Sequence, residues 1–284
     1  MAKVEPRVTK VTAGIDWLSA TLPQGALDYH VWVADCYWAL EQLAKEGFIL
    51  EHRKMQGYEG MGFGNCFVGE NDKGAFAQVT GEKANWFYPY TEHPKTHVSR
   101  IDAQITVQTD IVNLNEGKRC LVAARTHNKT LPVNKRRKPR MLLGEDGEDT
   151  VYIGSSSSDK QLRIYNKEAQ SEDIRYTRYW RYEAMLRNDA AAPLYRKCLS
   201  EVYPATEFIL SFVVDYCRQR GISIHGLEHI EPVALEYVVK PPTDIERKLK
   251  WLRDQVKPTI KKLSEAGYGD QAAEAMGLWI PKET

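Results

Sequence analysis

Two short segments near the middle of the chain place charged or hydroxyl side chains at every second position. They are residues 161–167 (QLRIYNK) and 179–186 (YWRYEAML). Alternate residues of an extended strand share one face, so a period of two indicates β-strands with distinct faces. The chain is therefore expected to build a sheet around these two strands.

The shared faces of these strands bring particular side chains together. On the first segment, Arg163, Tyr165 and Lys167 point to one side. On the second, Arg181 and Glu183 share a face, with aromatic residues on the reverse. A tyrosine flanked by two cations makes this a candidate site. The alternative interpretation of Tyr165 is a half-buried sheet tyrosine.

A third segment, residues 98–108, alternates in the same way. Arg100, Asp102 and Gln104 face one side of the expected strand, and apolar residues face the other. A carboxylate in the centre of a strand needs a partner, because burying an unpaired charge is costly. If the polar faces of the three strands converge, the site holds a tyrosine hydroxyl, two carboxylates and several cations.

The rest of the pattern predicts an α+β fold with a large, mainly antiparallel sheet and flanking helices. Residues 14–22 alternate as a first strand, and residues 63–79 have the turn-rich pattern of a β-meander. Apolar residues recurring at intervals of three and four predict helices. These cover residues 29–47, 113–126, 189–202 and 204–220.

The sequence also predicts how the chain divides into domains. Residues 1–222 are expected to form one domain, and residues 223–284 a mostly helical C-terminal appendage. Residues 85–93 (NWFYPYTEH) are expected to form an aromatic loop. Residues 128–149 contain prolines, a basic run and an acidic, Gly-rich end, which predicts a long inserted loop.

Charge is segregated along the chain, although the formal net charge is only +1. A net charge near zero gives no global attraction to a polyanion, so a nucleic-acid ligand would need a local basic patch. The alternative interpretation of such a run is a solvated surface. The long loop carries the candidate DNA-binding residues, which are Lys135, Arg136, Arg137, Lys138 and Arg140.

Composition limits the location and the metal chemistry. The five cysteines are widely spaced and lack a C-x-x-C pair, which argues against a disulfide framework or a zinc ribbon. No apolar stretch reaches the length of a membrane span, and the N-terminus has no apolar signal region. The protein is expected in the cytoplasm, without a membrane partner.

Four stretches carry a resemblance to a known family. They are AFAQVTGEKAN (75–85), SRIDAQIT (99–106), YIGSSSSDKQLRIYNK (152–167) and WRYEAMLRNDAA (180–191). Their order and spacing resemble the replication initiation factor family, often called Rep_trans. That family includes rolling-circle initiators of small plasmids, relaxases of integrative elements and phage replication proteins. The resemblance implies metal-dependent nicking and joining of one DNA strand at an origin, through a 5′-phosphotyrosine intermediate.

The resemblance implies that Tyr165 is the nucleophile, because the catalytic tyrosine of the family resembles the one in R-x-Y-x-K. A phenolate is a good leaving group, so the covalent link can be reversed, but its ordinary pKa of about 10 means that ionisation needs help. Arg163, Lys167 and Arg181 would steady the phosphate. The rival nucleophiles are Tyr176, Tyr179 and Tyr182.

The same resemblance implies Asp102 and Glu183 as metal ligands, with the carbonyl oxygen of Gln104 as a third. Carboxylates on adjacent strands give the hard oxygen environment that Mg²⁺ or Mn²⁺ prefers. The chain lacks the H-x-H pair with which the broader rolling-circle endonucleases hold their metal, and carboxylates take that place in Rep_trans proteins. Structural ion pairs with neighbouring arginines such as Arg100 are the alternative interpretation.

The implied partners are single-stranded or cruciform origin DNA, a host helicase and a DNA polymerase, and a homodimer is left open. Two other functions fit the same residues. A relaxase of a mobile element would use the same chemistry, whereas a replication regulator on the same scaffold would bind DNA without cutting it.

Overall fold

The protein forms two compact units, Met1–Glu236 and Tyr237–Thr284. In the described part of the second unit the chain forms the helices α8 (Lys257–Glu265) and α9 (Gly269–Ala275). The first unit contains the sheet and the helices packed on it. The computed structural model describes residues 7–110, 115–143, 149–167, 178–233 and 256–275, together with Leu235 and Leu252.

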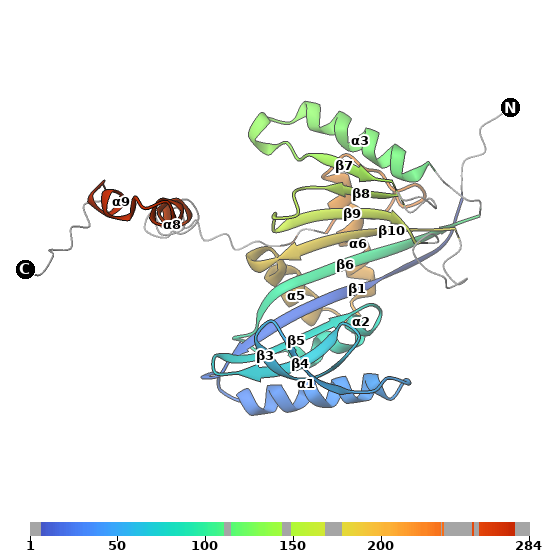
Figure 1. Cartoon of the computed structure of the whole chain (residues 1–284). Helices are drawn as coiled ribbons and strands as arrows, with labels where there is room; N and C mark the ends of the chain where they lie inside the picture. Colours follow the sequence, from blue (N-terminus) through green and yellow to red (C-terminus); the bar gives the residue numbers. More distant parts are fainter. Residues whose placement is uncertain are drawn as a thin grey trace, which may run out of the picture. The chain divides into compact units, whose positions relative to one another are not determined.

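The first unit is organised around one large sheet (Figure 1). Its strands are β1 (Val8–Pro23), β2 (Glu51–Met55), β3 (Tyr58–Phe63), β4 (Cys66–Asn71), β5 (Gly74–Thr80), β6 (His97–Thr109), β7 (Pro139–Leu142), β8 (Thr150–Ile153), β9 (Lys160–Asn166) and β10 (Tyr179–Arg187). The order across the sheet is β2-β3-β4-β5-β1-β6-β10-β9-β8-β7. Every neighbouring pair is antiparallel, which confirms the predicted α+β class and the antiparallel sheet.

The helices pack against the apolar face of this sheet. They are α1 (Tyr29–Ala44), α2 (Lys83–Phe87), α3 (Glu116–Thr130), α5 (Ala191–Ser200) and α6 (Thr206–Arg218). In Figure 1, α5 and α6 lie behind the central strands β1, β6 and β10, α1 lies along the β2–β5 meander, and α3 lies along β7 and β8.

Alternation along the central strands decides which face is buried. Ile101, Ala103 and Ile105 of β6 belong to the hydrophobic core together with Ile209 and Val213 of α6. Removing such side chains from water is the main driving force for docking these helices on the sheet. The polar residues between them are therefore left on the opposite face, as the period of two predicts.

Two segments predicted as loops contain regular structure. The aromatic segment 85–93 lies in α2 and the 3₁₀ helix η1 (Tyr88–Thr91), because its aromatic residues pack into the core: Phe87 and Tyr88 are buried. The expected loop 128–149 contains the last turn of α3, the 3₁₀ helix η2 (Val133–Lys135) and the edge strand β7. The prolines in it are compatible with an edge strand.

The division between the two units falls after Glu236, whereas the sequence predicted a boundary after residue 222. Ile222 and Leu227 are buried in the core of the first unit, so that unit continues past 222. The separation into a catalytic domain and a helical appendage as functional parts stays a prediction. Within the described residues, no helix is both long and apolar enough to cross a membrane.

Candidate active site

The polar faces of β6, β9 and β10 meet at the centre of the sheet. Glu183 of β10 stands opposite Gln104 of β6 on one side and Arg163 of β9 on the other. Arg181 stands opposite Tyr165. The side chains that the alternation placed on one face are thus direct cross-strand neighbours, a spacing at which side chains interact.

Tyr165 lies inside this cluster and is only 2% exposed. Its hydroxyl donates a hydrogen bond to Oε1 of Glu183 over 2.6 Å. Burial raises the pKa of Tyr165 well above its ordinary value, and the negative charge of Glu183 raises it further, while Arg181 and Arg163 oppose the shift. Tyr165 is therefore a neutral phenol whose proton already points at a carboxylate.

Glu183 is the most buried member of the cluster, with no exposed surface. Burial raises its pKa to about 7, although the positive charge of Arg163 opposes the rise. Arg163 Nε donates to Oε2 of Glu183 over 2.7 Å, and the Arg163 guanidinium carbon lies 4.7 Å from the centre of the Tyr165 ring. A carboxyl group with a pKa near neutrality, bonded to a phenol, can accept the phenolic proton.

Arg181 is held from two sides. Its Nε donates to Oγ1 of Thr106 over 2.9 Å, and its Nη1 donates to Oδ1 of Asp16 over 2.8 Å. These contacts fix the guanidinium beside Tyr165, where its positive charge opposes the rise of the phenol's pKa. Lys167 completes the set of cations, with Nζ 5.8 Å from the centre of the Tyr165 ring.

Asp16 is a member of the site that the sequence analysis did not assign. The pairing of β1 with β6 shifts between Ile15 and Trp17, which leaves Asp16 as the extra residue of a β-bulge. A bulge breaks the alternation and re-aims a side chain. The carboxylate of Asp16 thereby reaches Arg181. The sequence does show an aspartate within the strand pattern of residues 14–22. A strict period of two, however, does not predict on which face of the strand its side chain lies once a bulge is present.

Asp102 and Gln104, the other two predicted metal ligands, lie on the same face of β6 and are both buried. Asp102 pairs with Arg100, whose Nε and Nη2 lie 3.0 Å and 2.5 Å from its two carboxylate oxygens. Gln104 accepts a hydrogen bond from the Thr106 hydroxyl over 2.9 Å. The alternative interpretation of Asp102 as an ion-pair partner of Arg100 thus describes its contact in this structure.

The donor chemistry of Asp102, Gln104 and Glu183 nevertheless fits a divalent cation. Burial raises the pKa of both carboxyl groups, and the charges of Asp16 and Asp102 raise that of Glu183 further, so a cation would relieve this repulsion. No three His, Cys, Asp or Glu side chains form a ligand group among the described residues. Mg²⁺ commonly takes only one or two protein carboxylates and fills its shell with water and phosphate oxygens.

The rival tyrosines have different surroundings. Tyr182 is 2% exposed and lies on the core face, where its hydroxyl donates to Oε1 of Glu116 in α3 over 2.6 Å. The hydroxyl of Tyr179 donates to Oε1 of Gln108 over 2.9 Å. Tyr176 lies outside the described residues. The hydroxyls of Tyr182 and Tyr179 thus bond to Glu116 and Gln108, which lie outside the cluster around Glu183.

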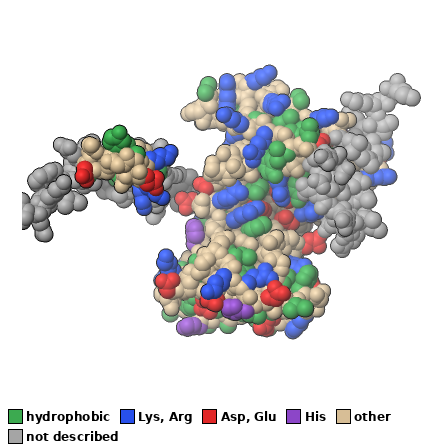
Figure 2. All heavy atoms as spheres, in the orientation of Figure 1, with side chains coloured by type: hydrophobic (Ala, Val, Ile, Leu, Met, Phe, Trp, Pro, Cys, Tyr) green, Lys and Arg blue, Asp and Glu red, His purple; other side chains and the backbone are tan. Residues whose placement is uncertain are grey.

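A row of polar side chains connects the cluster with the basic edge of the sheet. Glu183, Arg163, Tyr152 and Arg140 stand opposite one another on the successive strands β10, β9, β8 and β7. The Arg140 guanidinium carbon lies 5.0 Å from the centre of the Tyr152 ring, a cation–π distance. We call these four residues the polar row. Figure 2 shows Lys and Arg side chains gathered over this part of the sheet, between α1 and α3.

The predicted DNA-binding residues lie at that basic edge. Lys135 belongs to η2 and Arg140 to β7, with the other three cations between them. Lys135, Arg136, Lys138 and Arg140 are exposed, and Arg137 is half-buried. The structure therefore brings this group to one end of the polar row, although the sequence indicated no connection between the loop and the tyrosine.

Comparison with known proteins identifies the family. The profile of the replication initiation factor family, Rep_trans, matches residues 96–278. This match covers more than half of the chain, so the protein belongs to the replication initiation factor family. Its general role is therefore the initiation of DNA replication.

A solved structure supports the fold. The chain is similar to a rolling circle replication initiator protein from Geobacillus stearothermophilus, with a TM-score of 0.50 and 18% sequence identity. The similarity covers 79% of this chain and 93% of the other. Among curated proteins, no significant sequence match was found. At this identity the likeness concerns the fold.

Proposed function

We propose that this protein nicks and rejoins one DNA strand at a rolling-circle replication origin, with Tyr165 as the nucleophile. The observation that carries the proposal is the 2.6 Å hydrogen bond from the Tyr165 hydroxyl to Glu183, between the cations Arg163 and Arg181. Family membership and the rolling-circle initiator of similar fold support the same activity.

In the proposed step, the Tyr165 oxygen attacks a backbone phosphorus atom in line with the departing 3′-oxygen. The phenolic proton passes to Glu183 as the new bond forms, since burial disfavours a free phenolate. The P–O3′ bond breaks, the departing 3′-oxygen takes up a proton from water to become a 3′-hydroxyl, and the 5′-phosphate stays on Tyr165. Attack by a DNA 3′-hydroxyl on this phosphotyrosine reverses the step and rejoins the strand.

The charges around Tyr165 suit a phosphoryl transfer. Arg181 and Lys167 would bind the non-bridging oxygens, on which negative charge accumulates. Asp16 and Thr106 would hold Arg181 in this position. Asp102, Gln104 and Glu183 would hold Mg²⁺ or Mn²⁺, which when bound would polarise the phosphate and neutralise charge on it.

The single strand is proposed to approach along the polar row. Tyr152 offers an aromatic face for base stacking, and Arg140 and Arg163 flank it as phosphate contacts. The DNA substrate would be the unpaired strand of an origin, extruded as a cruciform or opened otherwise. Extension of the 3′-hydroxyl would then require a host helicase and polymerase, and a homodimer is compatible with this scheme.

The decisive test is a search for a covalent adduct. The protein is incubated with single-stranded oligonucleotides tiled across its own replicon, with Mn²⁺ or with EDTA, and analysed by mass spectrometry. We expect a metal-dependent adduct on Tyr165 that Tyr165→Phe abolishes, while affinity for the uncut strand changes by less than about twofold.

Tyr182→Phe is a matched control, because Tyr182 is also buried on the sheet and also donates to a carboxylate over 2.6 Å, but on the opposite face. This variant should keep the adduct. An adduct on another tyrosine would assign the role of nucleophile to that residue. Tight DNA binding without any adduct, indifferent to metal and to Tyr165→Phe, would support the non-cutting regulator instead.

A further inference from the structure

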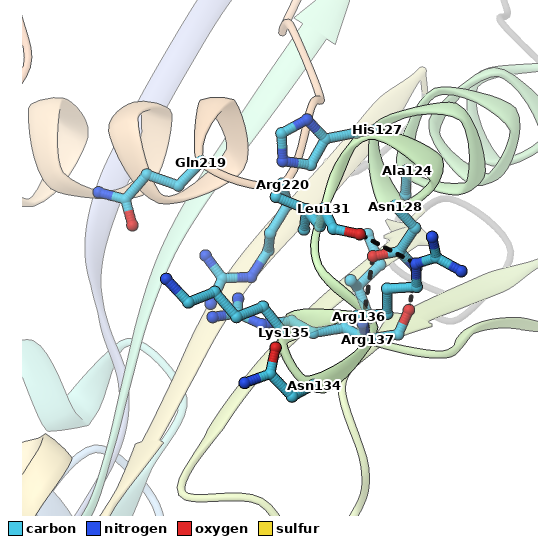
Figure 3. Close-up of a pocket in the computed structure, with 11 residues that line it drawn as sticks. Ala124, His127, Asn128, Leu131, Asn134, Lys135, Arg136, Arg137, Gln219 and Arg220 are labelled. Atoms are coloured by element: carbon cyan, nitrogen blue, oxygen red, sulfur yellow. Dashed lines mark hydrogen bonds between the residues drawn. The ribbon is translucent and has the colours of Figure 1, made fainter.

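A second site lies at the basic edge of the sheet, away from the tyrosine. A cavity of about 400 Å³ opens between the C-terminal end of α3, the segment that follows it and the C-terminal end of α6. Figure 3 shows Lys135 and Arg220 extending into this space from its two sides. We call it the arginine cavity. Its polar lining includes His127, Lys135, Arg136, Arg137, Gln219 and Arg220.

The arginine cavity concentrates positive charge. Four of its lining residues are cations, and among the described residues that line it there is neither Asp nor Glu. Burial lowers the pKa of the nearby Lys160, and the charges of Arg137 and Arg220 lower it further. The protonated form of Lys160 is thus disfavoured, because the neighbouring arginines already carry positive charge. Such a space favours an anion.

Arg220 is the innermost of these cations and is 3% exposed. Its guanidinium carbon lies 3.3 Å from the centre of the Tyr216 ring, and its Nη1 donates to the carbonyl oxygen of Tyr216 over 2.6 Å. Its place in the lining puts this guanidinium where an anion that enters the cavity would meet it. The contacts with Tyr216 hold the guanidinium in position before any ligand arrives.

The opposite wall is also fixed in advance. Asn128 of α3 bonds both backbone groups of Arg137: its Nδ2 donates to the carbonyl oxygen, and its Oδ1 accepts from the amide over 3.1 Å. Arg136 Nε donates to the carbonyl oxygen of Leu131 over 3.0 Å. These bonds tie the basic segment to the end of α3, so binding would cost little ordering of the chain.

The size of the cavity exceeds the needs of an inorganic anion. A volume of about 400 Å³ lies in the range of sites for small organic ligands. Part of the lining is apolar, from Leu131 and Ile153, and Asn134 and Gln219 supply amide groups. This lining matches a nucleotide: the cations suit its phosphate, the apolar surface suits the face of its base, and the amide groups suit the hydrogen-bonding edge of that base.

The arginine cavity lies on the helix side of the sheet, and residues that it shares with a second cavity lead towards the outer end of the polar row. A neighbouring cavity of about 530 Å³ shares Arg136 and Arg137 with it and is also lined by Arg140 and by serines of the β8–β9 loop. Arg140 is the outermost member of the polar row, which ends at Glu183 beside Tyr165. Shared residues therefore connect the arginine cavity to the tyrosine site.

We propose that the arginine cavity binds the phosphate group of one unpaired nucleotide in the DNA strand on which Tyr165 acts. The inference rests on the proposed function, because it takes the strand as the source of the nucleotide. A free nucleotide would bring the same phosphate chemistry from another source, and the two sources give different results in the test below.

The test measures binding by the full-length chain carrying Tyr165→Phe, so that cleavage does not interfere. The probe is a fluorescein-labelled single-stranded oligonucleotide from its own replicon, followed by fluorescence anisotropy over a salt series. Arg136→Gln and Arg220→Met should each weaken binding about fivefold and lower the salt slope by about 0.7. Arg125→Gln removes an exposed α3 cation that does not line the cavity, and should change affinity by less than about twofold.

A scan of neutral linkages locates the contact. One methylphosphonate is placed at successive positions of the oligonucleotide. At one position it should weaken binding to the parent protein but have no further effect on Arg220→Met. Arg136 is exposed, so Arg136→Gln keeps the test valid if Arg220→Met fails to fold.

Several results would overturn the inference. Normal oligonucleotide binding by both variants would do so. So would tight binding of deoxynucleoside monophosphate or inorganic phosphate, if the variants abolish that binding but leave oligonucleotide binding unchanged. The test also separates the two proposals. Weakened binding by these variants, together with no adduct from the chain that keeps Tyr165, would sink the nicking function alone. Adduct formation by that chain, together with unchanged binding by the variants, would sink the cavity alone.

Discussion

At the scale of single residues, the pair Tyr165–Glu183 makes a testable statement about pH. Glu183 has a pKa of about 7 and acts as a base only when ionised. Its ionised fraction rises through neutral pH, so the rate of adduct formation under single-turnover conditions should rise with it. Between about pH 8 and about pH 6 we expect a loss of up to about tenfold, and a smaller loss where the bound cation lowers the pKa of Glu183.

Glu183→Gln supplies the control for this profile. The glutamine preserves size and can still accept a hydrogen bond from Tyr165, but it cannot take up the proton. The variant should be slower by at least about a hundredfold at pH 8 and should lack the inflection near neutrality. An unchanged inflection in Glu183→Gln would assign the titration to another group and remove Glu183 from the role of base.

The site also shows which residues a sequence pattern can locate. Alternation alone placed Arg163 with Tyr165 on one strand face and Arg181 with Glu183 on another, because a period of two is the direct consequence of extended backbone geometry. It could not pair Tyr165 with Glu183, since strand register depends on contacts far apart in the chain. Asp16 escaped for a different reason, because a bulge reverses the expected direction of its side chain.

At the scale of elements, the strands and helices with a clear hydrophobic period were predictable, and those inside irregular segments were not. The alternation over 98–108 corresponds to β6, and the apolar recurrence over 29–47 corresponds to α1. Strand β7 is only four residues long and sits in a basic, proline-containing segment. Its pairing with β8 comes from tertiary contact, which overrides weak local preference.

Gly221 lies at a close contact between the end of α6 and α3, and the importance of this contact for stability can be measured. Gly221 follows α6 with φ +74°, and a Cβ at this position would lie 2.3 Å from Cβ of His127 in α3. Gly57, in the β2–β3 turn, has φ +85° but no neighbouring atom within 4 Å. Both pay the cost of a left-handed backbone on substitution, about 1–2 kcal/mol, but only Gly221 adds an overlap between two helices.

We therefore expect Gly221→Ala to lower the free energy of unfolding by about 1–3 kcal/mol more than Gly57→Ala. Chemical denaturation of the two variants measures the difference. Equal losses would mean that α3 and α6 can separate at this point without cost, and would undermine the preformed wall of the arginine cavity.

At the scale of the whole molecule, a net charge of +1 means that DNA affinity depends on local patches. The family match extends into the second unit as far as residue 278. Helix α8 of this unit carries three exposed lysines, Lys257, Lys261 and Lys262. The hydrophobic core cluster, in contrast, lies entirely in the first unit.

This separation predicts the behaviour of a chain that ends at Glu236. The shortened chain should unfold cooperatively and should still form the Tyr165 adduct on a short oligonucleotide at saturating concentration. It should bind longer single strands more weakly at low salt, with the salt slope smaller by up to about 2, because each lost lysine–phosphate contact contributes about 0.7.

The full-length variant with Lys257→Gln, Lys261→Gln and Lys262→Gln should reproduce the loss of affinity and leave the adduct intact, which separates the effect of charge from that of shortening the chain. A shortened chain that folds but forms no adduct would show that the second unit contributes groups to the reaction itself.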